Sequence, residues 1–218
     1  SATNPPYVRL DSQYIVRLRV MEDDNSCLFR AIAYTVKRNL ALVPELRKIA
    51  AAAILQKPID YNEAILGKPP VEYSQWIQKP SSWGGAIELA VFAEHYGIEI
   101  CSIDVQTLRV DRFRPTDESK VNDRVIIIYS GIHFDAIAMA QSIGDPEDFD
   151  QTVFNAGKEG DRVLDCAVKV AEEMQRRRDF TDTANFTLKC SICKAGLKGQ
   201  KDAITHANET GHSSFEEY

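Results

Sequence analysis

The stretch MEDDNSCLFRAIAYTV, residues 21–36, contains the clearest change of pattern in the sequence. Met21–Ser26 is a polar turn dense in Asp and Asn. From Ser26 onward, apolar residues recur at helical spacing, at positions 28, 29, 32, 33 and 36. The pattern predicts a helix with Cys27 in its first turn. Ser26 is the expected N-cap, because a serine hydroxyl can accept a hydrogen bond from a free backbone N–H.

Further helices and strands are predicted on both sides of this segment. A tail and a short strand containing Ile15 and Leu18 precede it. Helices are expected over residues 44–56, 59–66, 71–78 and 86–97. Strands rich in Ile and Val follow over residues 98–104, 107–113, 125–130 and 133–138. The continuous apolar run 125–128 is typical of a central strand buried on both faces. Helices first and strands later favour a layered α+β domain over a Rossmann alternation.

The remaining sequence divides into three shorter segments after a main domain of residues 1–140. Residues 141–160 contain Pro146 and several acidic residues, which is typical of a linker. Residues 161–185 have a helical apolar stripe that ends near Arg178. Residues 186–218 are expected to form a small finger. The chain is therefore predicted to have one main domain, an acidic linker, a long helix and a C-terminal finger.

Composition excludes several classes of protein. The net charge of -6 disfavours non-specific nucleic-acid binding, which needs clustered Lys and Arg. The five cysteines do not resemble a disulfide framework, which favours a reducing compartment and a cytoplasmic or nuclear location. We expect no membrane span and no signal peptide, because no apolar run is long enough. The chain begins at Ser1 rather than Met, so we expect further sequence upstream.

The spacing Cys190-x2-Cys193, twelve residues, His206-x5-His212 predicts a structural zinc finger. Zinc prefers four nitrogen or sulfur ligands in a tetrahedron, and a segment this short cannot bury enough surface to fold without metal. We expect a helix over residues 202–208, with Leu197 and Ile204 as a minimal core. The alternative is an incidental cysteine pair near two surface histidines. Acidic residues on the helix favour a structural or protein-binding finger over a DNA-binding one.

Cys27 is the cysteine best placed for catalysis. A thiolate at a helix N-terminus is stabilised by free N–H groups and the helix dipole. The backbone amides of Asp24, Asn25 and Cys27 could also bind an oxyanion formed when the sulfur attacks a carbonyl. Cys101 lies in an apolar strand and Cys166 on the long helix, where each is expected to be a small core residue.

His133 is the expected base for this thiol. Strand alternation puts His133 and Asp135 on the same side, so that the carboxylate can orient the imidazole. The alternative is a histidine with no catalytic role. His95, near a helix end, lacks such a context and is expected to be structural.

Three motifs resemble those of the ovarian-tumour (OTU) deubiquitinases. Asp24-Asn25-Ser26-Cys27-Leu28-Phe29 is similar to the cysteine loop of that family. Ser82-Trp83-Gly84-Gly85-Ala86-Ile87-Glu88 and Tyr129-Ser130-Gly131-Ile132-His133-Phe134-Asp135 resemble two further signatures, in the same order and spacing. The chain is most similar to the branch of yeast Otu and the human YOD-type thioesterase. That branch also has a long helix and a Cys-x2-Cys…His-x5-His finger after the catalytic domain.

The resemblance implies a papain-like, layered α/β/α cysteine protease fold with no catalytic cofactor. It makes Cys27 the nucleophile and His133 the general base in hydrolysis at the C-terminal glycine of ubiquitin in polyubiquitin chains. Asp24 matches an acidic position that the family counts with the active site. Asp135 matches a position whose Asp or Asn orients the imidazole. We favour Asp135 as the orienting acid and Asp24 as a residue that shapes the loop, although the sequence leaves the choice open.

Candidate substrate-binding residues lie within these motifs: Trp83, Gly84, Gly85, Glu88 and Ile132. The Gly84-Gly85 turn could let a narrow substrate tail pass close to the backbone, or it could simply cap a helix. Both interpretations stay open. Asp23, Asp24 and Glu88 would suit the arginine-rich tail of ubiquitin.

Members of this branch usually carry an N-terminal UBX-type domain that docks on a hexameric AAA ATPase, the valosin-containing segregase of ER-associated degradation. The present sequence lacks that domain, so such docking is expected of the parent protein only. Two alternatives remain. One is an inactive ubiquitin-binding adaptor, and the other is a cysteine peptidase that acts on another ubiquitin-like modifier.

Overall fold

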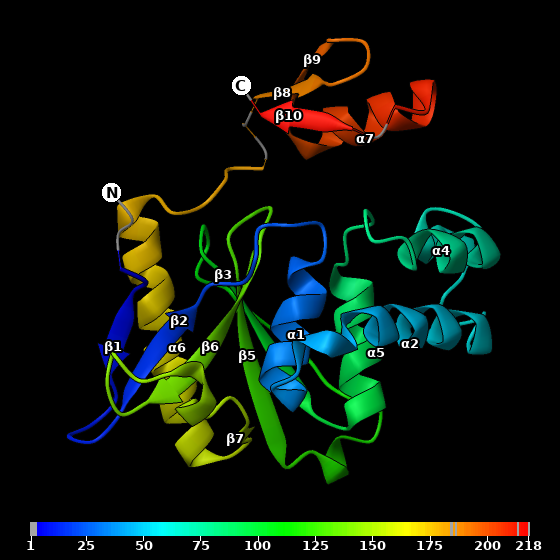
Figure 1. Ribbon diagram of the computed structural model, residues 1–218. Helices are drawn as coiled ribbons and strands as arrows, with labels where there is room; N and C mark the ends of the chain where they lie inside the picture. Colours follow the sequence, from blue (N-terminus) through cyan, green and yellow to red (C-terminus); the bar gives the residue numbers. More distant parts are fainter. Residues whose placement is uncertain (1–3, 184, 186, 213, 218) are drawn as a thin grey trace.

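The computed structural model describes residues 4–183, 185, 187–212 and 214–217 (Figure 1). Phe186 and Tyr218, the predicted limits of the finger, lie outside the described residues. A large domain is built around a mixed β-sheet, and a small three-stranded sheet with one helix forms the C-terminal part. None of the helices in the described part of the chain is long and apolar enough to cross a membrane.

The large sheet has the strand order β1-β2-β6-β5-β3-β4, and β7 pairs with β5. Its strands are β1 (Tyr7–Arg9), β2 (Ile15–Arg19), β3 (Glu99–Asp104), β4 (Val110–Phe113), β5 (Asp123–Tyr129), β6 (Phe134–Ala140) and β7 (Phe154–Asn155). β3 and β5 are parallel, and the other pairs are antiparallel. Val125–Ile128 is fully buried, which confirms the predicted central strand covered on both faces.

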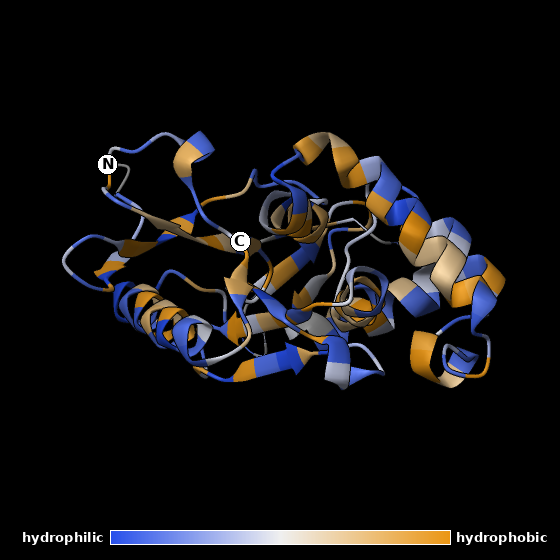
Figure 2. Ribbon diagram, turned by 90° about the horizontal axis from the view of Figure 1, so that it is seen from below, coloured by the Kyte–Doolittle hydropathy of each residue, from blue (hydrophilic) through white to orange (hydrophobic). Residues whose placement is uncertain are grey.

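Helices cover both faces of this sheet. One face carries α1 (Cys27–Lys37), α2 (Val43–Gln56), α3 (Glu63–Leu66), α4 (Pro70–Ile77) and α5 (Ala86–Tyr96). The other face carries α6 (Lys158–Arg177). Apolar residues of the helices and strands meet in two clusters, one on each side of the sheet, while the outer turns are largely polar (Figure 2). The predicted layered α/β/α fold is therefore confirmed.

The predicted acidic linker, residues 141–160, is folded into the large domain instead of connecting two bodies. It contains the 3-10 turn Glu147–Phe149 and strand β7, in which Phe154 is 3% exposed. Asp150 accepts hydrogen bonds from Arg19 and Tyr34. The predicted separate helix, α6, buries its apolar stripe against the sheet. The acidic composition of residues 141–160 suggested a solvated linker, but Phe154 is buried in the core and Asp150 is hydrogen-bonded to residues of the large domain.

Other limits also differ from the prediction. The expected N-terminal tail forms β1, which pairs with β2. The helix expected over residues 59–66 begins at Glu63, because the Asn62 side chain caps its first turn. The strand expected over residues 107–113 begins at Val110, after Leu108 adopts a left-handed conformation with φ of 60°. Short 3-10 turns occur at Leu40–Leu42 and Glu118–Lys120.

The finger consists of β8 (Thr187–Cys190), β9 (Gly196–Lys198), α7 (Gly199–Thr210) and β10 (Phe215–Glu217). Its helix is longer than predicted, because Gly211 ends it in a left-handed conformation beyond Thr210. Ile204 is 52% exposed, whereas Ala203 is 6% exposed. The prediction of Ile204 as a core residue is therefore wrong, since the helix turns the neighbouring position inward. Figure 1 shows the finger on the same side of the large domain as the β5–β6 turn and the start of α1.

Candidate active site and metal-ligand cluster

Cys27 is the first residue of α1 and lies at the end of the loop Asp24–Ser26. Its side chain belongs to the buried core and is 9% exposed. Asp24 holds the loop: its Oδ1 accepts the Ser26 N–H at 2.8 Å, and its Oδ2 accepts from Arg30 Nη2 at 2.7 Å. The hydrogen bond from Arg30 lowers the pKa of Asp24, so this carboxylate is charged at neutral pH. Asp24 therefore shapes the cysteine loop.

Ser26 occupies the N-cap position, but its hydroxyl does not cap the helix. Its Oγ instead accepts a hydrogen bond from Arg47 Nη2 at 2.9 Å. The predicted capping bond is therefore wrong. A buried arginine competes for the hydroxyl, and local sequence does not reveal that neighbour.

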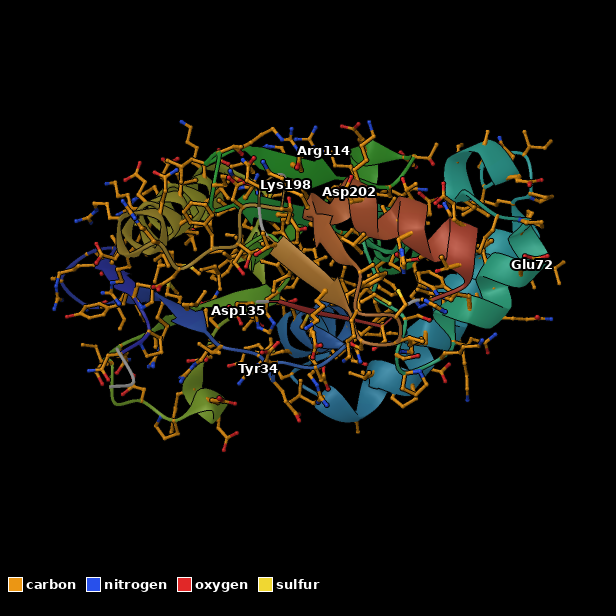
Figure 3. The ribbon with its side chains drawn as sticks, turned by 90° about the horizontal axis from the view of Figure 1, so that it is seen from above. Tyr34, Glu72, Arg114, Asp135, Lys198 and Asp202 are labelled. Atoms are coloured by element: carbon orange, nitrogen blue, oxygen red, sulfur yellow. The ribbon has the colours of Figure 1, made fainter. Side chains whose placement is uncertain are left out.

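His133 lies in the short turn between β5 and β6, opposite the start of α1. Its Nε2 is 2.9 Å from Asp135 Oδ1, and its side chain lies close enough to Cys27 for the thiol to raise the pKa of the imidazole. Asp135 is 5% exposed and also accepts the Met21 N–H at 2.7 Å, which fixes the carboxylate. Figure 3 labels Asp135 in the sheet. Cys27, His133 and Asp135 thus form one chain of contacts, and Asp24 is turned toward Arg30 instead.

The charge of His133 depends on these contacts. Burial lowers its pKa, but hydrogen bonds to Asp135 and Cys27 and the charges of both groups outweigh burial and raise the pKa to about 10. The imidazole is therefore protonated at neutral pH. With Nε2 bonded to Asp135, Nδ1 is the nitrogen left for proton exchange with the thiol. Nδ1 also lies 3.7 Å from the exposed carboxylate of Asp23.

Of the three backbone amides predicted to bind an oxyanion, two are available. The Asp24 N–H donates to the Glu22 carbonyl at 2.9 Å, so the prediction for this amide is wrong. The Cys27 N–H makes only a long contact of 3.4 Å, to the Asp24 carbonyl. Among the described residues, the Asn25 N–H has no acceptor. Asn25 and Cys27 therefore remain as candidate donors to a developing oxyanion.

The Trp83-Gly84-Gly85 motif lies against the cysteine loop. Trp83 is about half exposed, and its Nε1 donates to Asn25 Oδ1 at 2.6 Å. A Cβ added to Gly84 would lie 3.1 Å from the Phe29 ring, so this glycine permits close packing on α1. Gly85 is the N-cap of α5. These contacts favour packing and helix capping for the two glycines.

Glu88 does not face solvent, contrary to its prediction as a substrate-binding residue. It is 1% exposed and accepts hydrogen bonds from the Gly85 N–H and the Tyr73 hydroxyl, both at 2.7 Å. Burial raises its pKa. The carboxylate caps α5 at its third position, so it cannot meet a basic substrate tail. Ile132, beside His133, is partly exposed and remains a candidate contact.

The connection after α6 crosses the turn that carries His133, a feature that sequence reasoning missed. The Thr181 N–H donates to the Ser130 carbonyl at 2.7 Å. Gly131 has φ of 104°, and an added Cβ would lie 2.2 Å from the Thr181 carbonyl oxygen. Only glycine fits this combination of backbone angle and close approach. The sequence shows the glycine, but it does not show that Thr181 packs against it.

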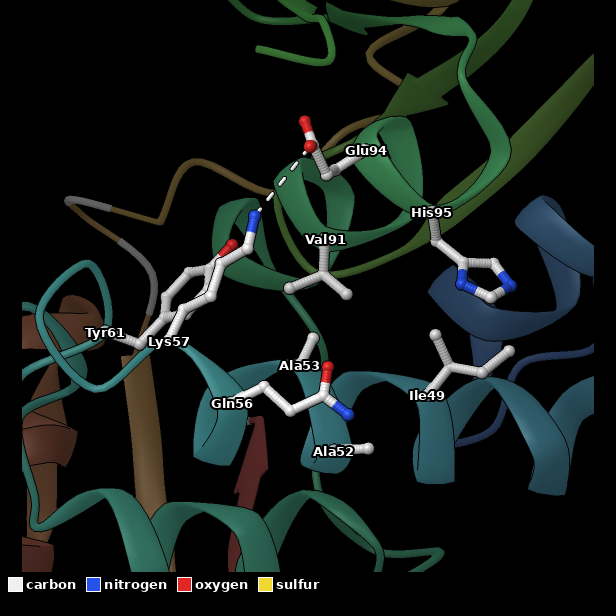
Figure 4. Close-up of a pocket in the computed structure, with 9 residues that line it drawn as sticks. All are labelled: Ile49, Ala52, Ala53, Gln56, Lys57, Tyr61, Val91, Glu94 and His95. Atoms are coloured by element: carbon white, nitrogen blue, oxygen red, sulfur yellow. Dashed lines mark ion pairs between the residues drawn. The ribbon is translucent and has the colours of Figure 1, made fainter.

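His95 lies elsewhere, in a groove between α2 and α5 (Figure 4). The groove is lined by Ile49, Val91 and an ion pair between Lys57 and Glu94. No cysteine is among its lining residues. The arrangement agrees with the structural role predicted for His95. Cys101 and Cys166 are buried, as expected of core residues.

Four side chains of the finger converge on one point. The ligand atoms of Cys190, Cys193, His206 and His212 all lie within 4.8 Å of one another. Cys193 Sγ is 3.4 Å from His206 Nε2, and Cys190 Sγ is 3.7 Å from His212 Nδ1. A tetrahedral zinc site with bonds of about 2.0–2.3 Å has edges of roughly 3.5 Å, so these residues fit the metal. Asp202 Oδ2 accepts the Lys198 N–H at 3.0 Å and fixes the start of α7 (Figure 3).

Comparison with known proteins agrees with both sites. Residues 184–218 match the family model described as "Ubiquitin thioesterase OTU1, C-terminal C2H2-type zinc finger". A solved structure titled "Structure of Ovarian Tumor (OTU) domain in complex with Ubiquitin" is 32% identical, with a TM-score of 0.68. The alignment covers 77% of this chain and 91% of that one.

Curated relatives match nearly the whole chain. The "OVARIAN TUMOR DOMAIN-containing deubiquitinating enzyme 2" of Arabidopsis thaliana is 45% identical over 206 residues, which is 94% of this chain and 98% of the relative. The "Putative ubiquitin thioesterase otu1" of Schizosaccharomyces pombe is 44% identical over 100% of this chain and 64% of the relative. Human "Ubiquitin thioesterase OTU1" is 42% identical over 97% of this chain and 60% of the relative. The chain thus spans less than two thirds of the latter two proteins. The resemblance read from three motifs is confirmed, and the chain belongs to the ovarian-tumour (OTU) family of cysteine proteases.

Proposed function

We propose that this chain is a cysteine-dependent deubiquitinase that hydrolyses the bond after the C-terminal glycine of ubiquitin. The observation that carries the proposal is the arrangement of Cys27, at the start of α1, beside His133, whose imidazole is hydrogen-bonded to Asp135. Family membership supports the choice of substrate, because one OTU domain at 32% identity was solved with ubiquitin. A thiol, an imidazole and an orienting carboxylate are the groups that acyl transfer through a thioester requires.

The reaction proceeds in two halves. Cys27 Sγ attacks the glycine carbonyl as a thiolate while His133 holds the proton. The tetrahedral intermediate collapses, the C–N bond breaks, and His133 gives its proton to the departing lysine amine. Water then attacks the thioester, and neutral His133 takes its proton. Collapse of the second intermediate returns the sulfur as leaving group, releases the ubiquitin carboxylate and leaves His133 protonated.

Asp135 orients the ring and favours the imidazolium that both halves use. Because its Oδ1 accepts from the His133 Nε2–H and from the Met21 N–H, the ring is held by a group that cannot swing away. The amides of Asn25 and Cys27 stabilise the oxyanion of each tetrahedral intermediate. Asp24 contributes indirectly, through the shape of the loop.

The expected substrates are isopeptide-linked polyubiquitin chains. Trp83 is exposed beside the cysteine loop and Ile132 is partly exposed beside His133, where a substrate tail would pass. Asp23, fully exposed, supplies negative charge next to His133 that suits basic residues in that tail. Glu88 no longer belongs to this set.

The finger is proposed to hold one structural zinc ion through Cys190, Cys193, His206 and His212. The fit of the four ligand atoms to a tetrahedron supports this assignment. Bound there, zinc would tie the β8–β9 turn to α7, and catalysis would not use it.

A role for the parent protein in ER-associated degradation, with a valosin-containing AAA ATPase as partner, is a further proposal. It draws on the likeness to the yeast Otu and YOD-type branch and on a cytoplasmic, or nuclear, location inferred from cysteine usage. Co-precipitation of the longer parent protein with the ATPase tests it. Absence of the complex at physiological salt would contradict it.

The main proposal is tested with a panel of diubiquitin linkages and a ubiquitin carrying a C-terminal electrophile. We expect the wild-type chain to cleave diubiquitin and to be labelled at Cys27, and Cys27→Ala to do neither. Binding of ubiquitin with neither labelling nor turnover would indicate an inactive adaptor. Faster reaction with other ubiquitin-like probes would indicate a peptidase for another modifier. Turnover by Cys27→Ala would show that another residue is the nucleophile.

A further inference from the structure

Arg47 is a charged residue in the core, next to the cysteine loop but outside all three motifs. It lies on α2 and is 3% exposed. Its guanidinium carbon lies 4.1 Å from the centroid of the Phe29 ring. A buried charge is costly unless hydrogen bonds compensate for lost water. The contacts of this side chain therefore indicate what it does.

Arg47 joins two loops through five hydrogen bonds. Nη1 donates to the carbonyls of Ile77 at 2.8 Å and Ser82 at 2.9 Å. Nη2 donates to the carbonyls of Asn25 at 3.2 Å and Pro80 at 3.1 Å, and to Ser26 Oγ at 2.9 Å. Four of the five acceptors are backbone carbonyls, so the guanidinium fixes the course of the main chain. The planar fork of arginine can reach both loops at once, which a lysine ammonium cannot.

The bond to Asn25 fixes one peptide plane of the cysteine loop. The carbonyl of the Asn25–Ser26 peptide accepts from Arg47, and its N–H donates to Asp24 Oδ1 at 2.8 Å. Held at both ends, this peptide cannot rotate without breaking a bond. The amides on either side of it, those of Asn25 and Cys27, are the proposed oxyanion donors. Rotation of the plane would turn both of them away from a substrate carbonyl.

Two further contacts tie the segment 83–84 to the cysteine loop and to α1. Trp83 Nε1 bonds Asn25 Oδ1, and Gly84 packs against the Phe29 ring. Arg47 differs from both in that it contacts the Asn25–Ser26 peptide itself.

We infer that Arg47 is a positioning residue for the proposed hydrolysis, which sets the orientation of the Asn25 and Cys27 amides without touching the substrate. The inference rests on the proposed function. Preorganised oxyanion donors act on the transition state, so their misplacement lowers kcat more than it raises KM.

Arg47→Lys, measured on ubiquitin with a fluorogenic C-terminal amide, tests the inference. We expect kcat to fall by about tenfold or more, with KM changed by less than about twofold, because one lost oxyanion donor costs roughly 10²–10³. In parallel, alkylation of Cys27 by iodoacetamide is followed by mass spectrometry. Alkylation needs the thiolate but forms no oxyanion, so its rate should stay within about twofold of wild type.

Arg124→Lys is the matched control. Arg124 is 2% exposed and bonds Glu99 and Asp161 at the opposite end of β5 from the His133 turn. Its replacement disturbs a buried arginine without reaching the cysteine loop, so kcat and alkylation should both be retained. An equal loss of kcat in both variants would overturn the inference, since general destabilisation would then explain it.

Two further results would overturn the inference: an unchanged kcat in Arg47→Lys, or alkylation that falls in parallel with kcat. If Arg47→Lys does not fold, Ser26→Ala carries the test. It removes one acceptor of Arg47 and should lower kcat a few-fold with normal alkylation, and an unchanged kcat would overturn the inference. A wild-type chain that is alkylated but cleaves no ubiquitin substrate would instead overturn the proposed function.

Discussion

Cysteine and histidine occur together in two regions of this chain, with different results. In the large domain, one thiol lies beside one imidazole, and that imidazole is hydrogen-bonded to the carboxylate of Asp135. In the finger, two thiols and two imidazoles converge within 4.8 Å. A pair with a third, orienting group can exchange a proton, whereas four convergent ligands make a closed metal site. The number and geometry of the partners, not the residue types, decide the chemistry.

The two regions also differ in what holds them. The proposed catalytic groups are attached to β6 and α1, which pack in a large apolar core. Within the finger, Cys190 and Ala203 are the buried apolar residues among those described. A segment with so small a core needs metal to fold. The catalytic site should therefore survive changes that unfold the finger, and the predictions below examine that independence.

Metal removal should produce the largest contrast. The purified chain should contain about one zinc, and chelation should unfold the finger entirely, because structural zinc contributes roughly 10–16 kcal/mol in finger peptides. Hydrogen exchange should show loss of protection in α7, while cleavage of a ubiquitin amide changes by less than about threefold. Cys193→Ser should behave like the chelated chain. A finger that stays protected without metal, or a loss of Cys27 alkylation on chelation, would contradict this independence.

Asp135→Asn should weaken only the catalytic pair. Loss of the carboxylate charge should lower kcat by about 10²-fold, less than the ~10⁴ seen when a triad tautomer is wrong, because an amide oxygen can still accept from the ring. The pH profile should change as well. In wild type, activity should fall as pH rises through about 10, where protonated His133 loses its proton. Without Asp135 the pKa of His133 is lower, so the fall should occur at lower pH.

The same contacts contribute to folding stability. The pKa of His133 is raised on folding, so this contribution is complete below about 6.5, its unfolded value, and is lost as pH rises through about 10. Denaturant unfolding of wild type and His133→Ala at pH 6 and pH 10 measures it. A stability difference between the two that does not shrink at pH 10 would contradict the raised pKa. In the activity profile of Asp135→Asn, a fall at the same alkaline pH as in wild type would show that Asp135 does not set the pKa of His133.

Gly131→Ala tests the contact between the His133 turn and the connection that leads from α6 to the finger. The added Cβ would lie 2.2 Å from the Thr181 carbonyl, at φ of 104°, so either the connection or the His133 turn must move. Such backbone strain costs about 1–3 kcal/mol, and we expect kcat to fall by roughly tenfold. Gly144→Ala is the control, because its Cβ meets nothing within 4 Å. Equal activity and melting temperature in the two variants would show that the contact with Thr181 is dispensable.

Trp83 should give the smallest effect. Trp83→Phe removes the hydrogen bond to Asn25 Oδ1 but keeps an aromatic ring, and Trp83→Ala removes both. A partly exposed hydrogen bond contributes about 0.5–1.5 kcal/mol, so we expect a two- to tenfold loss of kcat/KM in Trp83→Ala. If Trp83→Phe keeps the wild-type kcat/KM while Trp83→Ala loses activity, the aromatic ring contacts the substrate. If both variants lose the same activity, the hydrogen bond to Asn25 is what matters. If both variants keep the wild-type kcat/KM, Trp83 does not belong to the site.

The elements predicted with most success are those whose pattern is local and long. The helix beginning at Cys27, the helix ending at Gly97 and the buried strand at 125–128 were found close to their true limits. Short strands were missed: β1, β7 and β10 each have three residues or fewer. So few residues carry no periodicity, and they become strands only because a neighbouring edge is free to pair with them.

The roles of single side chains were likewise predicted poorly where they depend on distant neighbours. Glu88 looked like a surface acid, but a tyrosine hydroxyl and a backbone amide enclose it. No motif in the sequence assigned a role to Arg47, although positions 47, 50, 51 and 54 share the buried face of α2. Its place on that face, at helical spacing, was the one signal in the sequence that could have marked it.

By itself, the sequence determined the features that depend on residues a few positions apart. These are a cysteine at a helix start, a histidine and an aspartate two apart on a strand, and four metal ligands at finger spacing. Tertiary structure alone decided that Cys27 meets His133, that Arg47 bonds the cysteine loop, and that Thr181 crosses Gly131. The physical reason is that backbone periodicity and capping are short-range, whereas burial and pairing depend on which distant segments fill the same space.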